Sequence, residues 1–139
     1  MLKIQSLFVV MIAVSVMLPV TGCSQAAEHA TILTAEQAND MIKADSSVVL
    51  LDVRTPGEFA SSTGHLAGAM LIPVQELEQR AAELEPLKDR PILVYCRSGS
   101  RSSRAIGMLA DKGYKLYMLD GGITDWLSAG YPTEGGAGQ

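Results

Sequence analysis

Short apolar runs rich in β-branched residues alternate along this chain with segments whose apolar positions recur every three or four residues. Continuous apolar runs are typical of strands covered on both faces, and the wider spacing is typical of amphipathic helices. The pattern predicts strands at residues 46–53, 68–73, 91–95 and 115–119. Because strands that alternate with helices form βαβ units, we expect an α/β fold with a mostly parallel sheet flanked by helices on both faces.

Helix-start signals precede two of the predicted helices. Thr34 is followed by Gln37, and Thr55 by Glu58, a spacing at which the two side chains cap the first helical turn reciprocally. Pro56 occupies the first position of the second helix, where a missing N–H is tolerated. The predicted helices span residues 35–43, a short segment after Thr55, residues 74–84 before Pro86, residues 101–112, and a segment that follows residue 121 and ends near residue 130.

The first 23 residues have the layout of a secretory signal. A lysine at position 3 precedes an apolar stretch at residues 7–18, and small residues lead to Cys23. A stretch of about 12 apolar residues is too short for a helix that spans a bilayer, which needs about 20. The letters VTGC resemble the bacterial lipobox, in which the cysteine after the cleavage site carries the lipid. We expect a lipoprotein-type signal peptide at residues 1–22, with ordinary secretion or an uncleaved anchor as alternatives.

This processing predicts the organisation of the mature chain and its location. Cys23 becomes the lipid anchor that holds the protein to a membrane, residues 23–33 form a tether, residues 34–132 form a single domain, and residues 133–139 form a flexible tail. The protein is then exported, as a periplasmic or cell-envelope lipoprotein. Ser24, directly after the anchor, resembles an outer-membrane sorting signal.

Composition narrows the function classes. The chain has 139 residues, of which 47% are hydrophobic and 19% charged, as expected for one domain with a packed core. Its formal charge is -4 and no basic face is visible, so nucleic-acid binding is not expected. The two cysteines and the two histidines match no zinc-binding spacing, and no metal is predicted.

Cys96 lies where chemistry is expected in such a fold, between the predicted strand 91–95 and the next helix. Open α/β sheets bind ligands beyond the carboxyl ends of their strands. Gly99 and the neighbouring serines allow consecutive N–H groups to point inward, and together with Arg97 and Arg101 they should lower the pKa of Cys96. We therefore predict a reactive thiolate; the alternative is a cysteine that only packs in the core.

Three motifs resemble those of one known family. The letters CRSGSRS, residues 96–102, resemble the active-site loop of the rhodanese family, and LLDVRTPGEFASSTGHLAGAMLIP (50–73) and GGITDWLSAGYP (121–132) resemble its flanking signatures. The resemblance implies a rhodanese-like α/β domain and a thiosulfate sulfurtransferase. In that reaction the Cys96 thiolate takes the outer sulfur of thiosulfate or a similar donor, holds it as a persulfide, and passes it to cyanide or a thiol.

The resemblance also implies which groups bind substrate. The predicted binding site for a small anionic sulfur donor consists of Arg97, Ser98, Gly99, Ser100 and Arg101. The implied reaction requires no metal or organic cofactor, and the oligomeric state stays open. A phosphatase or arsenate reductase is a further alternative. It is less favoured, because four residues separate Cys96 from Arg101, whereas the loops of related phosphatases and arsenate reductases have five. The main alternative to the sulfurtransferase is a persulfide carrier or protein-binding module with little turnover of small donors.

Other residues attract attention but are assigned structural roles. Asp52 and Arg54 at the end of a strand are predicted to form an ion pair that shapes the site. His65 is expected to be a hydrogen-bonding structural residue, because a thiolate that is already ionised needs no general base. Trp126 is expected in the core. Arg104 is as compatible with a solvated surface position as with a functional one.

Overall fold

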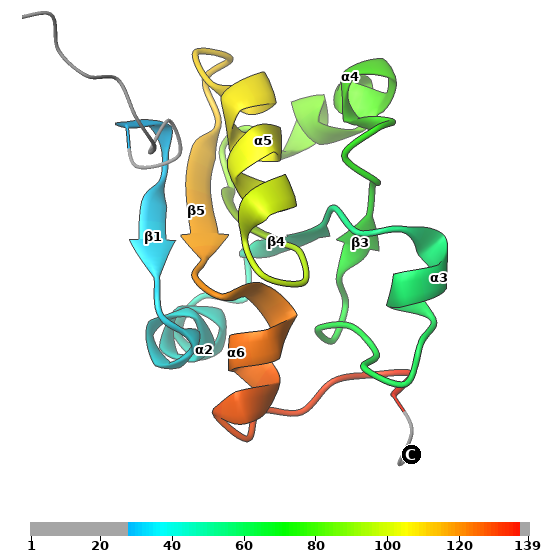
Figure 1. The fold of residues 1–139 in the computed structure, drawn as a ribbon. Helices are drawn as coiled ribbons and strands as arrows, with labels where there is room; N and C mark the ends of the chain where they lie inside the picture. The colour runs from blue at the N-terminus through cyan, green and yellow to red at the C-terminus, as the bar shows by residue number, and fades with distance from the viewer. Residues whose placement is uncertain (1–27, 137–139) are drawn as a thin grey trace, which may run out of the picture.

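A parallel five-stranded sheet forms the centre of the molecule (Figure 1). The computed structural model describes residues 28–136, and the strand order within them is β1-β5-β4-β2-β3. Each neighbouring pair of strands is parallel. The strands are β1 (Thr31–Leu33), β2 (Val49–Asp52), β3 (Met70–Leu71), β4 (Pro91–Tyr95) and β5 (Lys115–Leu119).

Helices cover both faces of this sheet. They are α2 (Ala35–Ala44), α3 (Pro56–Phe59), α4 (Leu77–Arg80), the 3₁₀ helix η1 (Ala81–Leu87), α5 (Ser100–Leu109) and α6 (Gly122–Ser128). Buried side chains of α4, η1 and α5 share one apolar cluster with one face of the sheet. Those of α2 and α6 share a second cluster with the opposite face. The predicted α/β class, with a parallel sheet and helices on both sides, is confirmed.

The two-residue period of β4 decides where the cysteine lies. Ile92 and Val94 belong to the cluster beneath α5, whereas Leu93 and Tyr95 belong to the cluster on the α2 and α6 side. Successive side chains of a strand point to opposite faces, and each fully buried aliphatic side chain contributes about 1.5–3 kcal/mol. Cys96 continues the alternation onto the α5 face and is 0% exposed.

Both predicted capping boxes are present. The Gln37 N–H donates to Thr34 Oγ1 at 3.2 Å, and the Thr34 N–H donates to Gln37 Oε1 at 3.0 Å. The Glu58 N–H likewise donates to Thr55 Oγ1 at 3.3 Å, and the Thr55 N–H donates to Glu58 Oε2 at 3.1 Å. The second box fixes the carboxylate of Glu58 at the start of α3.

The predicted helix at residues 74–84 is wrong in its boundaries. The Val74 N–H donates to the Val53 carbonyl at 3.1 Å and the Val74 side chain is buried, so Val74 lies in a turn held against the end of β2 and not in a helix. Helix α4 begins only at Leu77 and gives way to η1, which runs past the expected stop with Pro86 inside it.

Several other strands and helices are also shorter than predicted. The strands expected at 46–53 and 68–73 reduce to β2 and β3, and the helix expected at 101–112 ends at Leu109. Ala110 is extended with ψ 147°, and Asp111 follows with φ 59°, a left-handed conformation that interrupts the helix. The backbone after α5 therefore ends the helix at Leu109, the last apolar position of its predicted face.

The ends of the domain are more ordered than the predicted tether and tail imply. Residues 31–33, assigned to the tether, form the edge strand β1 paired with β5. In the predicted tail, the Glu134 N–H donates to the His65 carbonyl at 2.7 Å and the His65 N–H donates back at 2.9 Å. The predicted signal peptide, Cys23 and Ser24 lie outside the described residues. Within residues 28–136, no helix has the length and apolar character needed to span a membrane.

A buried ion pair lies at the carboxyl end of β2. Asp52 is 0% and Arg54 1% exposed, and Arg54 donates from Nε and Nη2 to the Asp52 carboxylate at 3.0 and 2.6 Å. Arg54 Nη2 also donates to the Gly64 carbonyl at 2.7 Å, and its guanidinium lies 5.7 Å from the Tyr95 ring centroid. The pair therefore ties the loop before β3 to the sheet, in agreement with the predicted structural role.

Two further structural assignments are confirmed. Trp126 is buried in the second apolar cluster and its Nε1–H donates to the Pro132 carbonyl at 2.9 Å. The His65 ring stacks on Phe59 with centroids 3.7 Å apart, and its Nδ1 lies 3.1 Å from the Phe59 carbonyl. Both side chains hold loops against the domain.

Replacement of Arg54 by Leu tests the importance of the buried pair. Because the change leaves the Asp52 carboxylate buried without its partner, the free energy of unfolding should fall by about 3–5 kcal/mol in urea titrations. Arg80→Leu is the matched control, since it removes only solvent-exposed ion pairs and should change stability by less than about 1 kcal/mol. Equal losses in the two variants would contradict the assignment.

Candidate active site

The loop between β4 and α5 wraps around the sulfur of Cys96. The Gly99 N–H donates to Cys96 Sγ at 3.0 Å. Gly99 stands at the N-terminus of α5 with φ 108°, a left-handed conformation that favours glycine. The turn at this glycine brings the start of α5 over the sulfur, as the sequence predicts.

Helix α6 fixes the orientation of the loop peptides from outside. The Ile123 N–H donates to the Cys96 carbonyl at 2.9 Å, and the Thr124 N–H and Oγ1–H donate to the Arg97 carbonyl at 3.2 and 2.9 Å. In a trans peptide the N–H points opposite to the carbonyl, so outward carbonyls turn the N–H groups of the loop toward the sulfur. Gly122 permits this approach, because a Cβ there would lie 2.4 Å from the Cys96 carbonyl oxygen.

The pKa of Cys96 lies below its ordinary value. Burial is the largest single influence and raises the pKa, but four hydrogen-bond contributions together outweigh it: the hydroxyl and N–H of Ser102 and the N–H groups of Gly99 and Ser98. The predicted direction is therefore present in the structure. The expected N–H donors contribute to this lower pKa, the Ser102 hydroxyl adds to them, and the two arginines are not among its main causes.

Ser102 is a site residue that the sequence prediction missed. It is fully buried, and its Oγ makes no well-aligned hydrogen bond among the described residues, yet it lies close enough to the sulfur to favour the thiolate. A signal for it exists in the sequence. Ser102 shares the helical spacing of Ala105, Ile106 and Leu109, which line the buried face of α5, so its hydroxyl must point inward beneath the loop.

Arg101 is held by a carboxylate from another part of the chain. Its Nη1 and Nη2 donate to Glu58 Oε2 and Oε1 at 2.6 and 2.7 Å, a bidentate pair that joins α5 to α3. The Arg101 hydrogen bond is the main cause that lowers the pKa of Glu58 to about 2, so Glu58 is ionised at neutral pH. The capping pattern identified Glu58 only as a helix cap, and its bond to the loop depends on tertiary structure.

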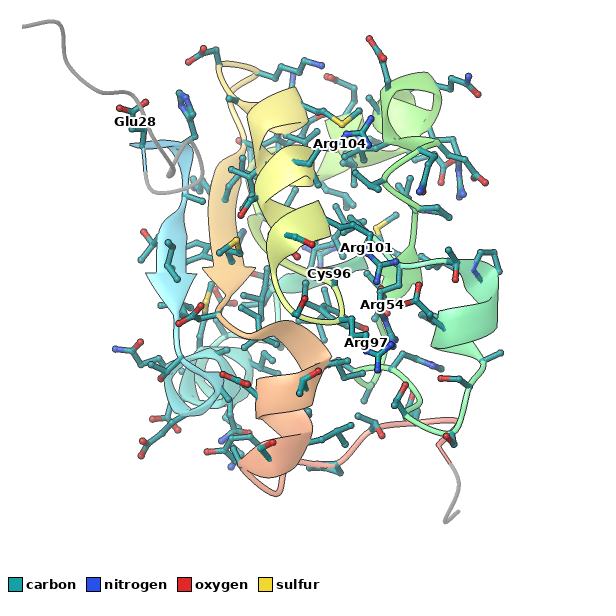
Figure 2. All side chains as sticks on the ribbon, viewed as in Figure 1. Glu28, Arg54, Cys96, Arg97, Arg101 and Arg104 are labelled. Atoms are coloured by element: carbon teal, nitrogen blue, oxygen red, sulfur yellow. The ribbon has the colours of Figure 1, made fainter. Side chains whose placement is uncertain are left out.

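The remaining predicted residues lie on the surface of the loop. Arg97, Ser98 and Ser100 are exposed, and Arg104 is exposed one turn further along α5. Figure 2 shows the side chains of Arg97 and Arg101 between the Cys96 loop and α3. Arg97 is therefore placed to meet an incoming ligand, while its role in binding a donor stays a prediction.

The described part of the chain offers no evident set of metal ligands. Within residues 28–136, no cluster of three or more histidine, cysteine, aspartate or glutamate side chains is arranged to hold a metal ion. The groups gathered at Cys96 are instead a sulfur, backbone N–H donors, a hydroxyl and guanidinium groups. Such a set suits nucleophilic attack by a thiolate on an anionic ligand.

Removal of the Ser102 hydroxyl tests its contribution to the thiolate. Ser102→Ala deletes one hydrogen-bond contribution worth about 1 kcal/mol, so the rate of Cys96 alkylation by iodoacetamide at pH 7 should fall about three- to tenfold and recover at higher pH. Ser103→Ala is the control, because its hydroxyl contacts Met118 Sδ at 3.6 Å instead. An unchanged profile in Ser102→Ala would contradict the assignment.

Comparisons with known proteins agree with this geometry. Residues 34–129 match the family model described as the rhodanese-like domain. A sulfurtransferase of Allochromatium vinosum is 35% identical over 101 residues, which cover 72% of this chain and 91% of that protein. The thiosulfate sulfurtransferase PspE of Escherichia coli is 35% identical over 75 residues, 54% of this chain and 70% of that protein.

A solved structure also resembles this fold. The crystal structure of a rhodanese-related protein from Thermoplasma volcanium aligns with a TM-score of 0.65 and 32% identity, covering 73% of this chain and 95% of that one. The family match extends over most of the chain and includes the Cys96 loop, the motif at residues 50–73 and residues 121–129 of the downstream motif. The chain therefore belongs to the rhodanese-like sulfurtransferase family.

Proposed function

We propose that this protein transfers a sulfane sulfur from thiosulfate or a similar donor to cyanide or a thiol, through a persulfide on Cys96. The observation that carries the proposal is the closed loop around Sγ, in which backbone N–H groups and the Ser102 hydroxyl stabilise a buried thiolate. The thiosulfate sulfurtransferase among the relatives supports the choice of donor.

The first half-reaction forms the persulfide. The Cys96 thiolate attacks the outer sulfur of thiosulfate, a new S–S bond forms, and the old S–S bond breaks with its electron pair leaving on sulfite. The total charge of -3 is conserved, because a thiolate and a dianion become a persulfide anion and sulfite. The N–H groups that face Sγ are also oriented to stabilise the negative outer sulfur.

The second half-reaction restores the thiolate. Cyanide attacks the outer sulfur of the persulfide, a C–S bond forms, and the S–S electron pair returns to Cys96 as thiocyanate leaves. A thiol acceptor in its thiolate form reacts in the same way and leaves as its own persulfide. Neither step needs an external oxidant or reductant, because the sulfur moves between nucleophiles at a constant total oxidation level.

Burial of the nucleophile favours sulfur over phosphorus as the transferred atom. Cys96 is fully buried, so a reactant must present a small terminal atom to the loop. The outer sulfur of a thiosulfate-like donor is such an atom, whereas a phosphoryl group carries three oxygens around its reacting centre. The short loop from Cys96 to Arg101 supports the same conclusion.

Thiocyanate formation from thiosulfate and cyanide tests the function directly. The purified protein should form thiocyanate, and Cys96→Ser should reduce the rate by at least about a thousandfold because the nucleophile is lost. Ser103→Ala serves as the active control. Thiocyanate formation that persists in Cys96→Ser, or hydrolysis of an aryl phosphate that depends on Cys96, would contradict the proposal.

Mass spectrometry separates the enzyme from the alternative function. Donor treatment should add about 32 Da, the mass of one sulfur atom, to Cys96. An adduct that cyanide discharges rapidly supports the sulfurtransferase. A stable adduct with negligible turnover supports the persulfide carrier or protein-binding module instead, and complete absence of an adduct contradicts both.

We also propose that the protein works in the cell envelope, held to a membrane by a lipid on Cys23. Support comes from the signal layout and the lipobox-like VTGC letters. In cells grown with an alkyne-labelled fatty acid, the wild-type protein should become labelled, while Cys23→Ser should lose the label because the acceptor thiol is absent. Cys96→Ser is the control for the second cysteine and should keep the label. Labelling of Cys23→Ser would contradict the anchor.

A further inference from the structure

The Glu58–Arg101 pair removes a positive charge from the rim of the site. Arg101 was predicted to bind an anionic donor, yet both of its terminal nitrogens donate to the Glu58 carboxylate at 2.6 and 2.7 Å. Arg101 and Glu58 are 27% and 29% exposed, so solvent screens the pair only in part. The guanidinium therefore faces an incoming anion with its charge compensated.

Glu58 is held in this position from two sides. Besides Arg101, the Thr55 N–H and Oγ1–H donate to Glu58 Oε2 at 3.1 and 2.9 Å. The bond from the Thr55 N–H belongs to the capping box of α3, so rotation of Glu58 away from Arg101 would break the cap as well as the ion pair. The carboxylate is a fixed charge of the site rather than a mobile surface group.

Two of the arginines beside the Cys96 loop are therefore compensated by carboxylates. Asp52 compensates Arg54 and Glu58 compensates Arg101. Arg97, which directly follows Cys96 in the chain, is exposed, as is Arg104 further along α5. A dianionic donor therefore gains little net attraction from Arg54 or Arg101, because Asp52 and Glu58 each cancel the charge of one of these guanidinium groups.

We propose that Glu58 is a specificity-determining residue, which weakens the binding of dianionic donors and favours sulfane-sulfur donors of lower negative charge, such as organic thiosulfonates and persulfides of weakly charged thiols. The proposal rests on the sulfur-transfer function described above. It makes thiosulfate a usable donor but not the preferred class.

Two donors that differ in charge provide the test. Thiosulfate carries two negative charges and methanethiosulfonate carries one, while both present an outer sulfur bonded to a sulfonyl-type sulfur. Attack by Cys96 releases sulfite from the first and methanesulfinate from the second. The measured quantity is the ratio of kcat/KM for thiosulfate to that for methanethiosulfonate, with cyanide as the acceptor for both.

Glu58→Gln removes the charge while keeping a residue that capping boxes accept at this position. The ratio should rise about three- to tenfold, mainly through a lower KM for thiosulfate, and the increase should shrink at high salt. The matched control is Glu83→Gln, which neutralises a bidentate partner of Arg80 on the exposed surface and should leave the ratio within about twofold of wild type.

The double variant Glu58→Gln/Arg101→Gln is a second test of the proposal, for the case that the single variant folds poorly. Because it removes both members of a compensated pair, its ratio should stay within about twofold of wild type. A ratio unchanged in Glu58→Gln, or a large fall in the double variant, would overturn the role of Glu58. Sulfur adducts on wild-type Cys96 with both donors would show that sulfur transfer itself survives that result, whereas absence of both adducts would reject the underlying function.

Discussion

The contact between the N-terminus of α6 and the Cys96 loop is the constraint on which the site depends. Donors from Ile123 and Thr124 hold the carbonyls of Cys96 and Arg97 outward, and the planar peptides then turn the loop N–H groups inward. Only a glycine at position 122 leaves room for this contact. A residue that follows the cysteine by 26 positions thus sets the electrostatic surroundings of the sulfur.

Two opposing effects determine the state of that sulfur. The alternation of β4 places Cys96 in the core, where burial alone would keep the thiol protonated. The inward N–H groups and the Ser102 hydroxyl reverse this effect without a large positive charge, since Glu58 compensates Arg101. The result is a thiolate stabilised mainly by short-range donors, a suitable arrangement for accepting one sulfur atom in a confined space.

Local pattern was sufficient for the elements that carry the site, because capping boxes, strand alternation and the cysteine loop are encoded by neighbouring residues. The local pattern failed where contacts between residues far apart in the chain determine the structure. Val74 continues an apolar helical pattern but lies in a turn, where its N–H bonds to the Val53 carbonyl. Glu58 was explained by its cap, and only the fold brings it to Arg101. Ser102 was grouped with a polar loop, although its spacing along α5 indicates a buried face.

The chemistry of the site therefore depends on the protonation state of one thiol in the folded protein. A direct test is to follow the thiolate absorbance of Cys96 near 240 nm against pH, with Cys96→Ser as the spectral blank. The structure predicts a titration midpoint below the ordinary value of a free cysteine thiol, because the hydrogen-bond donors lower the pKa of Cys96. A midpoint at or above that value, in protein that is folded across the titration, would contradict the central claim that the loop overcomes the effect of burial.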